Sequence, residues 1–195
     1  CQEVFGKDIP LAGDLGLEID KKVRNKTVNG VLADMVTGYV GDVFEFEVTV
    51  TNLSLTADIS DAKLYDSKAM IGTKVLRVND NTELTWVDDG MGGAMLDIGT
   101  VPADTTLTFR YLYTAVAADE GDIIENIATV KGVVKPVSPN YPEIPFEAED
   151  DATVNILTPP PQTGESGNNG TLAGLLLLAS GVVAILFRRR YLRGR

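Results

Sequence analysis

Five consecutive residues near the C-terminus have the form of a peptide that an enzyme can grip. They are Pro160, Pro161, Gln162, Thr163 and Gly164. The ring of Pro161 fixes its own backbone angle φ and disfavours a helical conformation at the preceding residue, so the segment is biased toward extended backbone. The cleft of a protease or a transpeptidase binds an extended chain. The pentapeptide is therefore a candidate substrate for such an enzyme.

The segments around this pentapeptide occur in a fixed order. Residues 158–171 form a proline-rich and polar linker, residues 172–187 are apolar or small, and residues 188–195 are basic. As a helix, residues 172–187 span about 24 Å, close to the roughly 30 Å of a bilayer's hydrocarbon core. The arginines that follow stay on the cytoplasmic side. We therefore expect a single transmembrane helix at 172–187, with everything before Leu172 outside the cell.

This ordered set resembles the sortase substrate signal of Gram-positive surface proteins, which is Leu-Pro-any-Thr-Gly, an apolar segment and a basic tail. In that family a sortase cysteine attacks the threonine carbonyl and passes the acyl group to an amine of the peptidoglycan precursor. The resemblance implies cleavage between Thr163 and Gly164 and a location in the cell wall. Pro160 stands where the family usually has leucine, which leaves the sortase class open. The alternative is a single-pass membrane protein that no sortase cuts.

The rest of the chain is acidic and lacks histidine. Five of the 17 basic residues lie in 188–195, so the preceding residues carry 12 basic and 28 acidic side chains. Such a surface repels phosphate backbones, which argues against nucleic acid as a partner. Without histidine the commonest general base and metal ligand are missing, and no Ser-His-Asp set, phosphate loop or zinc spacing is present. We expect no enzymatic turnover, no cofactor and no metal site.

The single cysteine, Cys1, can form no internal disulfide. An exported domain without disulfides must rely on its core or on another crosslink. The chain starts without a methionine or an apolar signal segment, although its C-terminal signal requires export. We therefore expect further residues before Cys1, and residues 1–14 are interpreted as a linker or the tail of a preceding domain.

Residues 15–157 show the two-residue period of half-buried strands. The clearest case is residues 41–52, where Phe44, Phe46, Val48 and Val50 point to one side and polar side chains to the other. No part of this region shows a helical period over three turns, so an all-β antiparallel sandwich is predicted. Strands are expected at residues 17–23, 41–52, 59–66, 73–78, 83–87, 94–98, 105–117, 123–131 and 152–156.

Two segments between the expected strands are assigned to loops. Prolines at every third position from Pro136 to Pro145 favour a stiff polyproline II connection. The acidic cluster at residues 147–151 is interpreted as a solvated turn, because it does not match the ligand pattern of a calcium loop.

Several pieces of the domain resemble the conserved-repeat, Ig-like domains of bacterial pilins and adhesins. They are residues 17–23, 41–52, 62–66, 98–109 and 125–130. In many such domains an isopeptide bond joins a lysine of the first strand to an asparagine of a late strand, assisted by a buried acid. The resemblance implies that these residues are Lys21, Asn126 and Asp66.

Strand alternation agrees with this assignment, because it points Lys21, Asn126 and Asp66 toward the apolar interior. Burial favours the neutral forms of an amine and a carboxyl group, so the amine can attack and the acid can hydrogen-bond to the amide carbonyl. Three alternatives stay open. A register slip of one residue would exchange Lys21 for Lys22. Glu125 or Asp42 could be the assisting acid. Lys21 could also lie on an edge strand and reach water.

These observations predict a wall-anchored stalk or adhesin-type domain that is not an enzyme. A pilin subunit is one alternative, with Lys131 or Lys135 as the lysine used for polymerisation. The anchoring module of a surface enzyme, whose catalytic domain would precede Cys1, is another. A host or surface ligand is not specified by the sequence.

Overall fold

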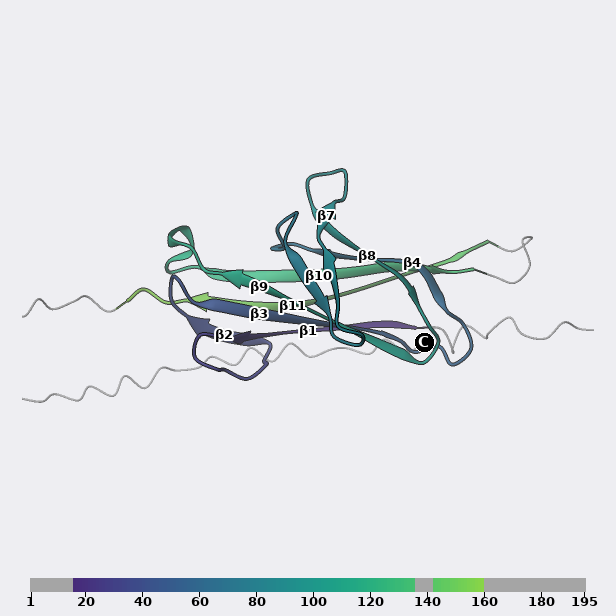
Figure 1. Cartoon of the computed structure of the whole chain (residues 1–195), viewed down its shortest axis with the longest axis horizontal. Coiled ribbons are helices and arrows are strands. Elements are labelled where there is room, and N and C mark those ends of the chain that lie inside the picture. Colours follow the sequence, from purple (N-terminus) through teal and green to yellow (C-terminus); the bar gives the residue numbers. More distant parts are fainter. Residues whose placement is uncertain (1–15, 136–141, 160–195) are drawn as a thin grey trace, which may run out of the picture. The chain divides into compact units, whose positions relative to one another are not determined.

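The computed structural model describes residues 16–135 and 142–159. These residues form eleven β-strands and one short 3-10 helix, η1 (Figure 1). The bounds are β1 Leu17–Asn25, β2 Met35–Gly38, β3 Val43–Asn52, β4 Ile59–Asp66, β5 Lys74–Arg77, β6 Thr82–Thr85, β7 Val87–Asp88, β8 Ala94–Val101, β9 Thr105–Thr114, η1 Ala117–Asp119, β10 Ile123–Val134 and β11 Ile144–Ile156.

The strands form two sheets that enclose one core. The five-stranded sheet has the order β1-β3-β9-β5-β6, and the six-stranded sheet has the order β2-β11-β10-β4-β8-β7. All pairs are antiparallel except β2 with β11, which is parallel. The predicted all-β sandwich is therefore confirmed, with the correction that one of its sheets is mixed.

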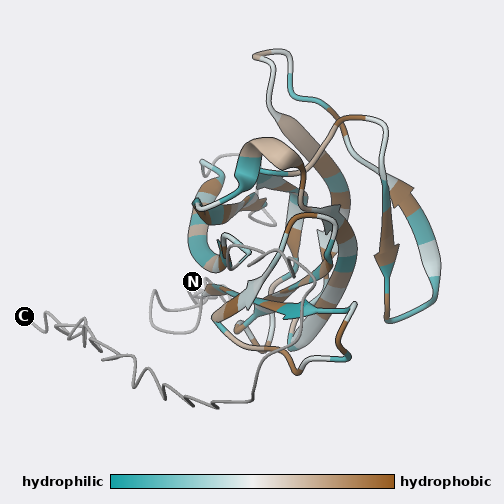
Figure 2. Ribbon diagram, turned by 90° about the vertical axis from the view of Figure 1, so that its left-hand side faces the viewer, coloured by the Kyte–Doolittle hydropathy of each residue, from teal (hydrophilic) through white to brown (hydrophobic). Residues whose placement is uncertain are grey.

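The core lies between the sheets and follows the alternation of the sequence. Phe44, Phe46, Val48 and Val50 of β3 are fully buried, as predicted, and they face buried residues of β4, β8 and β10. Apolar and polar segments alternate along the strands in Figure 2. Trp86, which connects β6 in one sheet to β7 in the other, is also fully buried.

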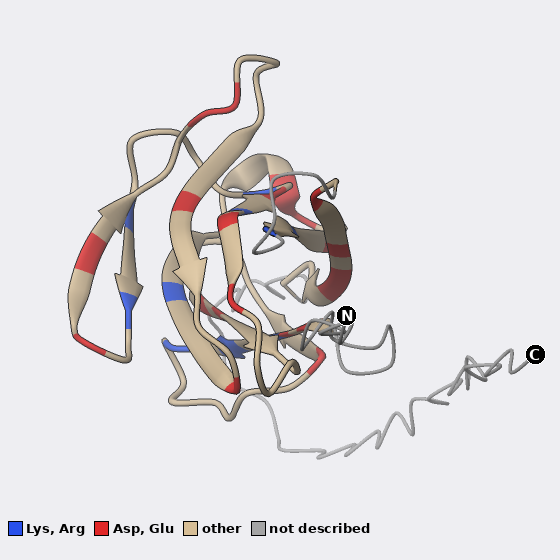
Figure 3. Cartoon of the chain, turned by 90° about the vertical axis from the view of Figure 1, so that its right-hand side faces the viewer, with Lys and Arg blue, Asp and Glu red and all other residues tan. Residues whose placement is uncertain are grey.

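Aspartate and glutamate, red in Figure 3, occur along the strands and in the loops.

Three parts of the sheet with order β2-β11-β10-β4-β8-β7 differ from the sequence prediction. One is β7, because the single strand expected at residues 83–87 is divided between β6 in one sheet and β7 in the other. The strand β2 was not expected, because four residues are too few for a recognisable period. Residues 144–151, assigned to a loop and an acidic turn, are the first part of β11 and pair with β10. Because β2 pairs only with residues 153–156, the first part of β11 is an edge, where proline and charged side chains are tolerated. Pro145 lies at the start of this edge, opposite Val133.

The chain enters the sandwich at one end and leaves it at the other. Leu17, the first residue of β1, pairs with Asn52, the last residue of β3. At the opposite end Gly38 lies so close to Asn25 that a Cβ atom on it would be 2.8 Å from Asn25 Nδ2. Gly38 also pairs with Ile156, the last residue of β11. We call these the Leu17 end and the Ile156 end.

Several sequence predictions fall on parts of the chain outside the described residues. They concern the linker 1–14, the pentapeptide 160–164, the transmembrane segment 172–187 and the basic tail 188–195. Among the residues that the structure does describe, no helix has the length and hydrophobicity needed to cross a membrane.

Candidate functional site

The centre of the candidate site is a lysine buried between the two sheets. Lys21 lies in the middle of β1, and its side chain is completely buried. Its Nζ atom is 2.6 Å from Asp66 Oδ2 and 5.2 Å from the centre of the Phe46 ring. A buried ammonium is costly without a partner charge, and here the partner comes from the opposite sheet.

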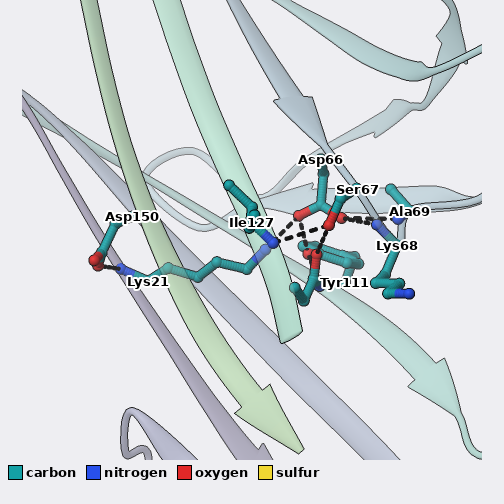
Figure 4. A network of polar contacts seen from close by, with 9 residues as sticks. Lys21, Asp66, Ser67, Lys68, Ala69, Tyr111, Ile127 and Asp150 are labelled. Carbon is teal, nitrogen blue, oxygen red and sulfur yellow. Dashed lines mark hydrogen bonds and ion pairs between the residues drawn. The ribbon is translucent and has the colours of Figure 1, made fainter. Parts of the chain in front are cut away.

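Asp66 is the last residue of β4 and accepts several hydrogen bonds (Figure 4). Its Oδ2 atom accepts from Lys21 Nζ and from the Tyr111 hydroxyl. Its Oδ1 atom accepts from the backbone N–H groups of Lys68 at 3.0 Å and Ala69 at 2.7 Å, in the turn after β4. The turn therefore fixes the orientation of the Asp66 carboxylate, and Oδ2 is directed toward the buried side chains of the core.

Asn126 completes the cluster from the neighbouring strand β10. It is fully buried, and its Nδ2 atom donates to the Tyr111 hydroxyl oxygen at 3.0 Å. The Ser67 hydroxyl donates to Asn126 Oδ1 at 3.2 Å. Ser67 is itself held in place, because its Oγ atom accepts a hydrogen bond of 2.9 Å from the Ile127 backbone N–H. Both polar atoms of the amide are thus occupied.

The structure brings together Lys21, Asp66 and Asn126 and separates the alternatives from them. Lys22 points to the outer face, where Nζ forms ion pairs with Asp34 and Asp20. Glu125 is exposed. Asp42 instead accepts hydrogen bonds from Asn25 Nδ2 and the Tyr39 backbone N–H near the Ile156 end.

Three members of the site were not identified from the sequence. The ring of Tyr111 packs on Phe46 with ring centroids 5.5 Å apart, as a core residue does, but its hydroxyl also links Asp66 to Asn126. Because Tyr111 occupies an inward-facing position of β9, strand alternation could have indicated that its hydroxyl lies in the core with the lysine. Ser67 lies beyond the end of β4, where alternation gives no orientation. Asp150 lies in the part of β11 that was assigned to a turn.

Asp150 connects the edges of the two sheets next to the buried lysine. Its Oδ2 atom accepts a hydrogen bond of 2.7 Å from the backbone N–H of Lys21. β1 is the outer strand of its sheet, so this N–H has no strand partner on that side. The contact holds β1 against β11 and fixes the position from which the Lys21 side chain enters the core.

The surroundings of Lys21 shift its protonation equilibrium toward the neutral amine. Burial lowers the pKa of Lys21, and the nearby Asp66 carboxylate opposes this effect only in part. Burial and the same carboxylate raise the pKa of Tyr111 well above its ordinary value, so its hydroxyl keeps its proton. The outward-facing Lys22 behaves oppositely, because hydrogen bonds to Asp34 and Asp20 raise its pKa. A neutral amine can attack the carbonyl carbon of a nearby primary amide in a transamidation that releases ammonia.

The lowered pKa of Lys21 predicts a pH dependence in a variant that cannot form this amide. In Asn126→Ala, Lys21 stays an amine, and below its ordinary pKa of 10.5 the unfolded chain binds the proton that the folded chain has lost. The free energy of unfolding should therefore rise with pH from the folded-state pKa up to 10.5, by at most about 1.4 kcal/mol per pH unit. Urea unfolding across a pH series measures this slope.

The matched control is the double variant Lys21→Met and Asn126→Ala, which lacks the titrating amine. The difference between the two variants isolates Lys21, because Tyr111 and the surface groups are present in both. Parallel pH profiles of the two variants would contradict the burial of Lys21 as a titrating amine.

Within residues 16–135 and 142–159, no three acidic or cysteine side chains converge in a way that could hold a metal ion.

Comparison with known families identifies the C-terminal signal. Residues 161–190 match the family model described as the LPXTG cell wall anchor motif. The match begins at Pro161, directly after the unusual Pro160, and includes Thr163, Gly164 and the apolar segment. The protein is therefore a Gram-positive-type, cell-wall-anchored surface protein with an extracellular location. The motif implies processing by a sortase and attachment to peptidoglycan.

Comparison with solved structures finds similarities at low sequence identity. No protein with a curated description matches the sequence. Among solved structures, the sporulation control protein Spo0M of Bacillus subtilis is 10% identical, with a TM-score of 0.35 over 73% of this chain and 49% of that one. The C-terminal domain of wzt is 11% identical, with a TM-score of 0.36 over 80% of this chain and 84% of that one. Similarities this weak carry no conclusion about function.

Proposed function

We propose that residues 15–157 form a stalk or adhesin-type domain of this cell-wall-anchored protein, crosslinked internally by an isopeptide bond between Lys21 and Asn126. The observation that carries the proposal is the buried contact of Lys21 Nζ with Asp66, whose other core partner, Tyr111, holds the Asn126 amide. The attachment point is Thr163, since it is the threonine of the matched anchor motif.

The reaction is a single self-modification. Lys21 Nζ attacks the Cγ atom of Asn126, a new N–C bond forms, the bond from Cγ to Nδ2 breaks, and ammonia leaves. The product is an amide between β1 and β10, which belong to different sheets. No group is regenerated for a second cycle, so the domain is a substrate of its own chemistry and not an enzyme.

Burial supplies a reason for the reaction to proceed. An ion pair enclosed between two sheets loses the hydration of both charges, and its mutual attraction compensates for this loss only with good geometry. Conversion of the Lys21 amine to an amide removes one of these charges from the core permanently. A crosslink that closes a loop of about 100 residues also stabilises a folded protein by about 4 to 5 kcal/mol in the chain-entropy model.

The position of the bond suits a domain under tension. The chain enters at the Leu17 end and leaves at the Ile156 end, so a pull between the N-terminal side of the domain and the cell wall acts along β1 and β11. A bond from Lys21 to Asn126 carries this load past residues 22–125, which include most of both sheets. This arrangement supports a stalk.

The intact mass of purified residues 1–160, which include all the described strands, tests the bond. We expect the mass to be lower than the sequence mass by one ammonia. Lys21→Ala and Asn126→Ala should each retain the full mass of their sequences, because one reacting atom is missing. Digestion followed by peptide mass mapping should then recover one branched peptide that contains both residues.

Lys22→Ala is the matched control, since it removes the neighbouring lysine that faces outward. It should lose ammonia like the parent protein. An unmodified parent mass, or a loss of ammonia that persists in Asn126→Ala, would refute the proposed bond.

A further inference from the structure

We propose that Tyr111 and Ser67 are catalytic residues of the amide-forming step, Tyr111 as a proton relay to the leaving nitrogen and Ser67 as a hydrogen-bond donor to the carbonyl oxygen. This inference rests on the proposed isopeptide bond. It assigns functions to two side chains that the reaction itself does not consume.

Tyr111 lies between the proton acceptor and the leaving group. Its hydroxyl donates to Asp66 Oδ2, the same atom that contacts Lys21 Nζ at 2.6 Å. The same hydroxyl oxygen accepts from Asn126 Nδ2 at 3.0 Å. The attacking nitrogen and the departing nitrogen are thus connected through one carboxylate oxygen and one phenol. The Tyr111 ring cannot drift from this position, because it packs between Phe46 and Trp86 with both centroid distances at 5.5 Å.

Ser67 lies where negative charge develops during the attack. Its hydroxyl points to Asn126 Oδ1 at 3.2 Å, and the Ile127 N–H occupies the acceptor side of the same hydroxyl at 2.9 Å. The backbone N–H of Ser67 donates to the Ile127 carbonyl oxygen at 2.9 Å, which anchors the residue to β10. A donor held in this way needs little reorganisation when the carbonyl oxygen becomes an oxyanion.

The protons balance along this chain of contacts. The Lys21 ammonium first gives one proton to Asp66, which leaves a neutral amine and a carboxylic acid. Attack on Asn126 Cγ places negative charge on Oδ1, which Ser67 stabilises. Asp66 then passes its proton to Tyr111, and Tyr111 passes its own proton to Nδ2. Ammonia leaves with the bonding electron pair, the carbonyl reforms, and the new amide nitrogen returns its extra proton to Asp66.

The surroundings of Tyr111 agree with a relay that is protonated at rest. Burial and the adjacent carboxylate raise its pKa well above the ordinary tyrosine value. The phenol therefore holds a proton over the whole neutral range and can give it up only as it receives another. A buried phenolate beside a carboxylate is avoided at every step.

The test measures the rate of ammonia loss in residues 1–160 after a short pulse of synthesis, by intact mass at increasing times of incubation. Tyr111→Phe keeps the ring packing and removes only the hydroxyl, so we expect the reaction to be about 100-fold slower or more but to reach completion. Ser67→Ala should slow it by about 100-fold, and Ser67→Thr should restore most of the rate, because a hydroxyl returns.

Tyr113→Phe is the matched control on the same strand, since the Tyr113 hydroxyl contacts Asp119 and not the cluster. It should react at the parent rate. Cooperative urea unfolding of the unreacted Tyr111→Phe and Ser67→Ala proteins would show that slow reaction is not a failure to fold.

The outcomes separate this inference from the proposed bond. If the parent protein never loses ammonia, the proposed bond itself fails. If the parent reacts and Tyr111→Phe reacts at the same rate, the relay is overturned. Parent-like rates in Ser67→Ala, or no recovery in Ser67→Thr, would overturn the assignment of Ser67.

Discussion

Replacing Thr163 by alanine is expected to abolish covalent attachment of the protein to the cell wall and to leave it in the membrane fraction. Thr163 is the threonine of the matched anchor motif, and its carbonyl carbon is where a sortase thiolate would form the acyl intermediate. Alanine keeps this carbonyl but lacks the side chain that defines the motif, so we expect the enzyme not to recognise the segment, and without the acyl intermediate no transfer to a peptidoglycan amine occurs. Cell fractionation, followed by release of wall-bound protein with a muralytic enzyme, measures the effect directly.

The neighbouring position supplies the matched control for this experiment. Gln162 occupies the position at which the signal accepts any residue, so Gln162→Ala should attach like the parent. Pro160→Leu restores the usual first residue of the signal and should attach at least as well. Wall attachment of Thr163→Ala at the parent level would contradict the assigned cleavage site, as would recovery of wall-bound protein that keeps its arginine end.

The isopeptide bond should change how far the domain can be stretched. With the bond present, a pull between residues 17 and 156 bypasses residues 22–125, and only residues 127–156 can extend. At about 3.3 to 3.6 Å per residue this segment adds roughly 100 Å. In Asn126→Ala the whole domain can unravel and should add more than about 400 Å. Single-molecule force spectroscopy on residues 1–160, held by handles at both ends, distinguishes the two lengths.

The structure also predicts where the residual extension in the crosslinked domain begins. Asn126 pairs with Ala152, so the force separates β10 from β11 starting at the Ile156 end. Lys22→Ala should give the short extension, since it leaves the bond intact. A long extension in the parent protein, despite the loss of one ammonia, would mean that the bond joins other residues than Lys21 and Asn126.

The C-terminal signal could be identified from the sequence because it is a linear sorting motif. Its recognition depends on the order of a short motif, an apolar run and basic residues, and none of these needs the folded domain. The family match to residues 161–190 agrees with this interpretation. Location was therefore the part of the function that required no tertiary structure.

The strands and the inward side chains were predictable for a related reason. Side chains alternate between the two faces of a strand, so the pattern of β1, β4 and β10 alone points Lys21, Asp66 and Asn126 inward. The two-residue period could not be recognised where strands are short or lie at the edge of a sheet. The four residues of β2 show no pattern, and the acidic first part of β11 resembles a turn because one of its edges is open.

The partners of the buried lysine were decided only by the tertiary structure. Alternation shows which residues face the core, but the spatial relation of the two sheets decides which of them meet. That relation brought Asp66 rather than Glu125 or Asp42 to Lys21, and it placed the Tyr111 hydroxyl between Asp66 and Asn126. The sequence by itself thus determined the cell-wall sorting signal and the side chains that face the core, because both depend on short stretches of sequence. The chemistry of the cluster depends on contacts between distant strands, which only the packed sandwich creates.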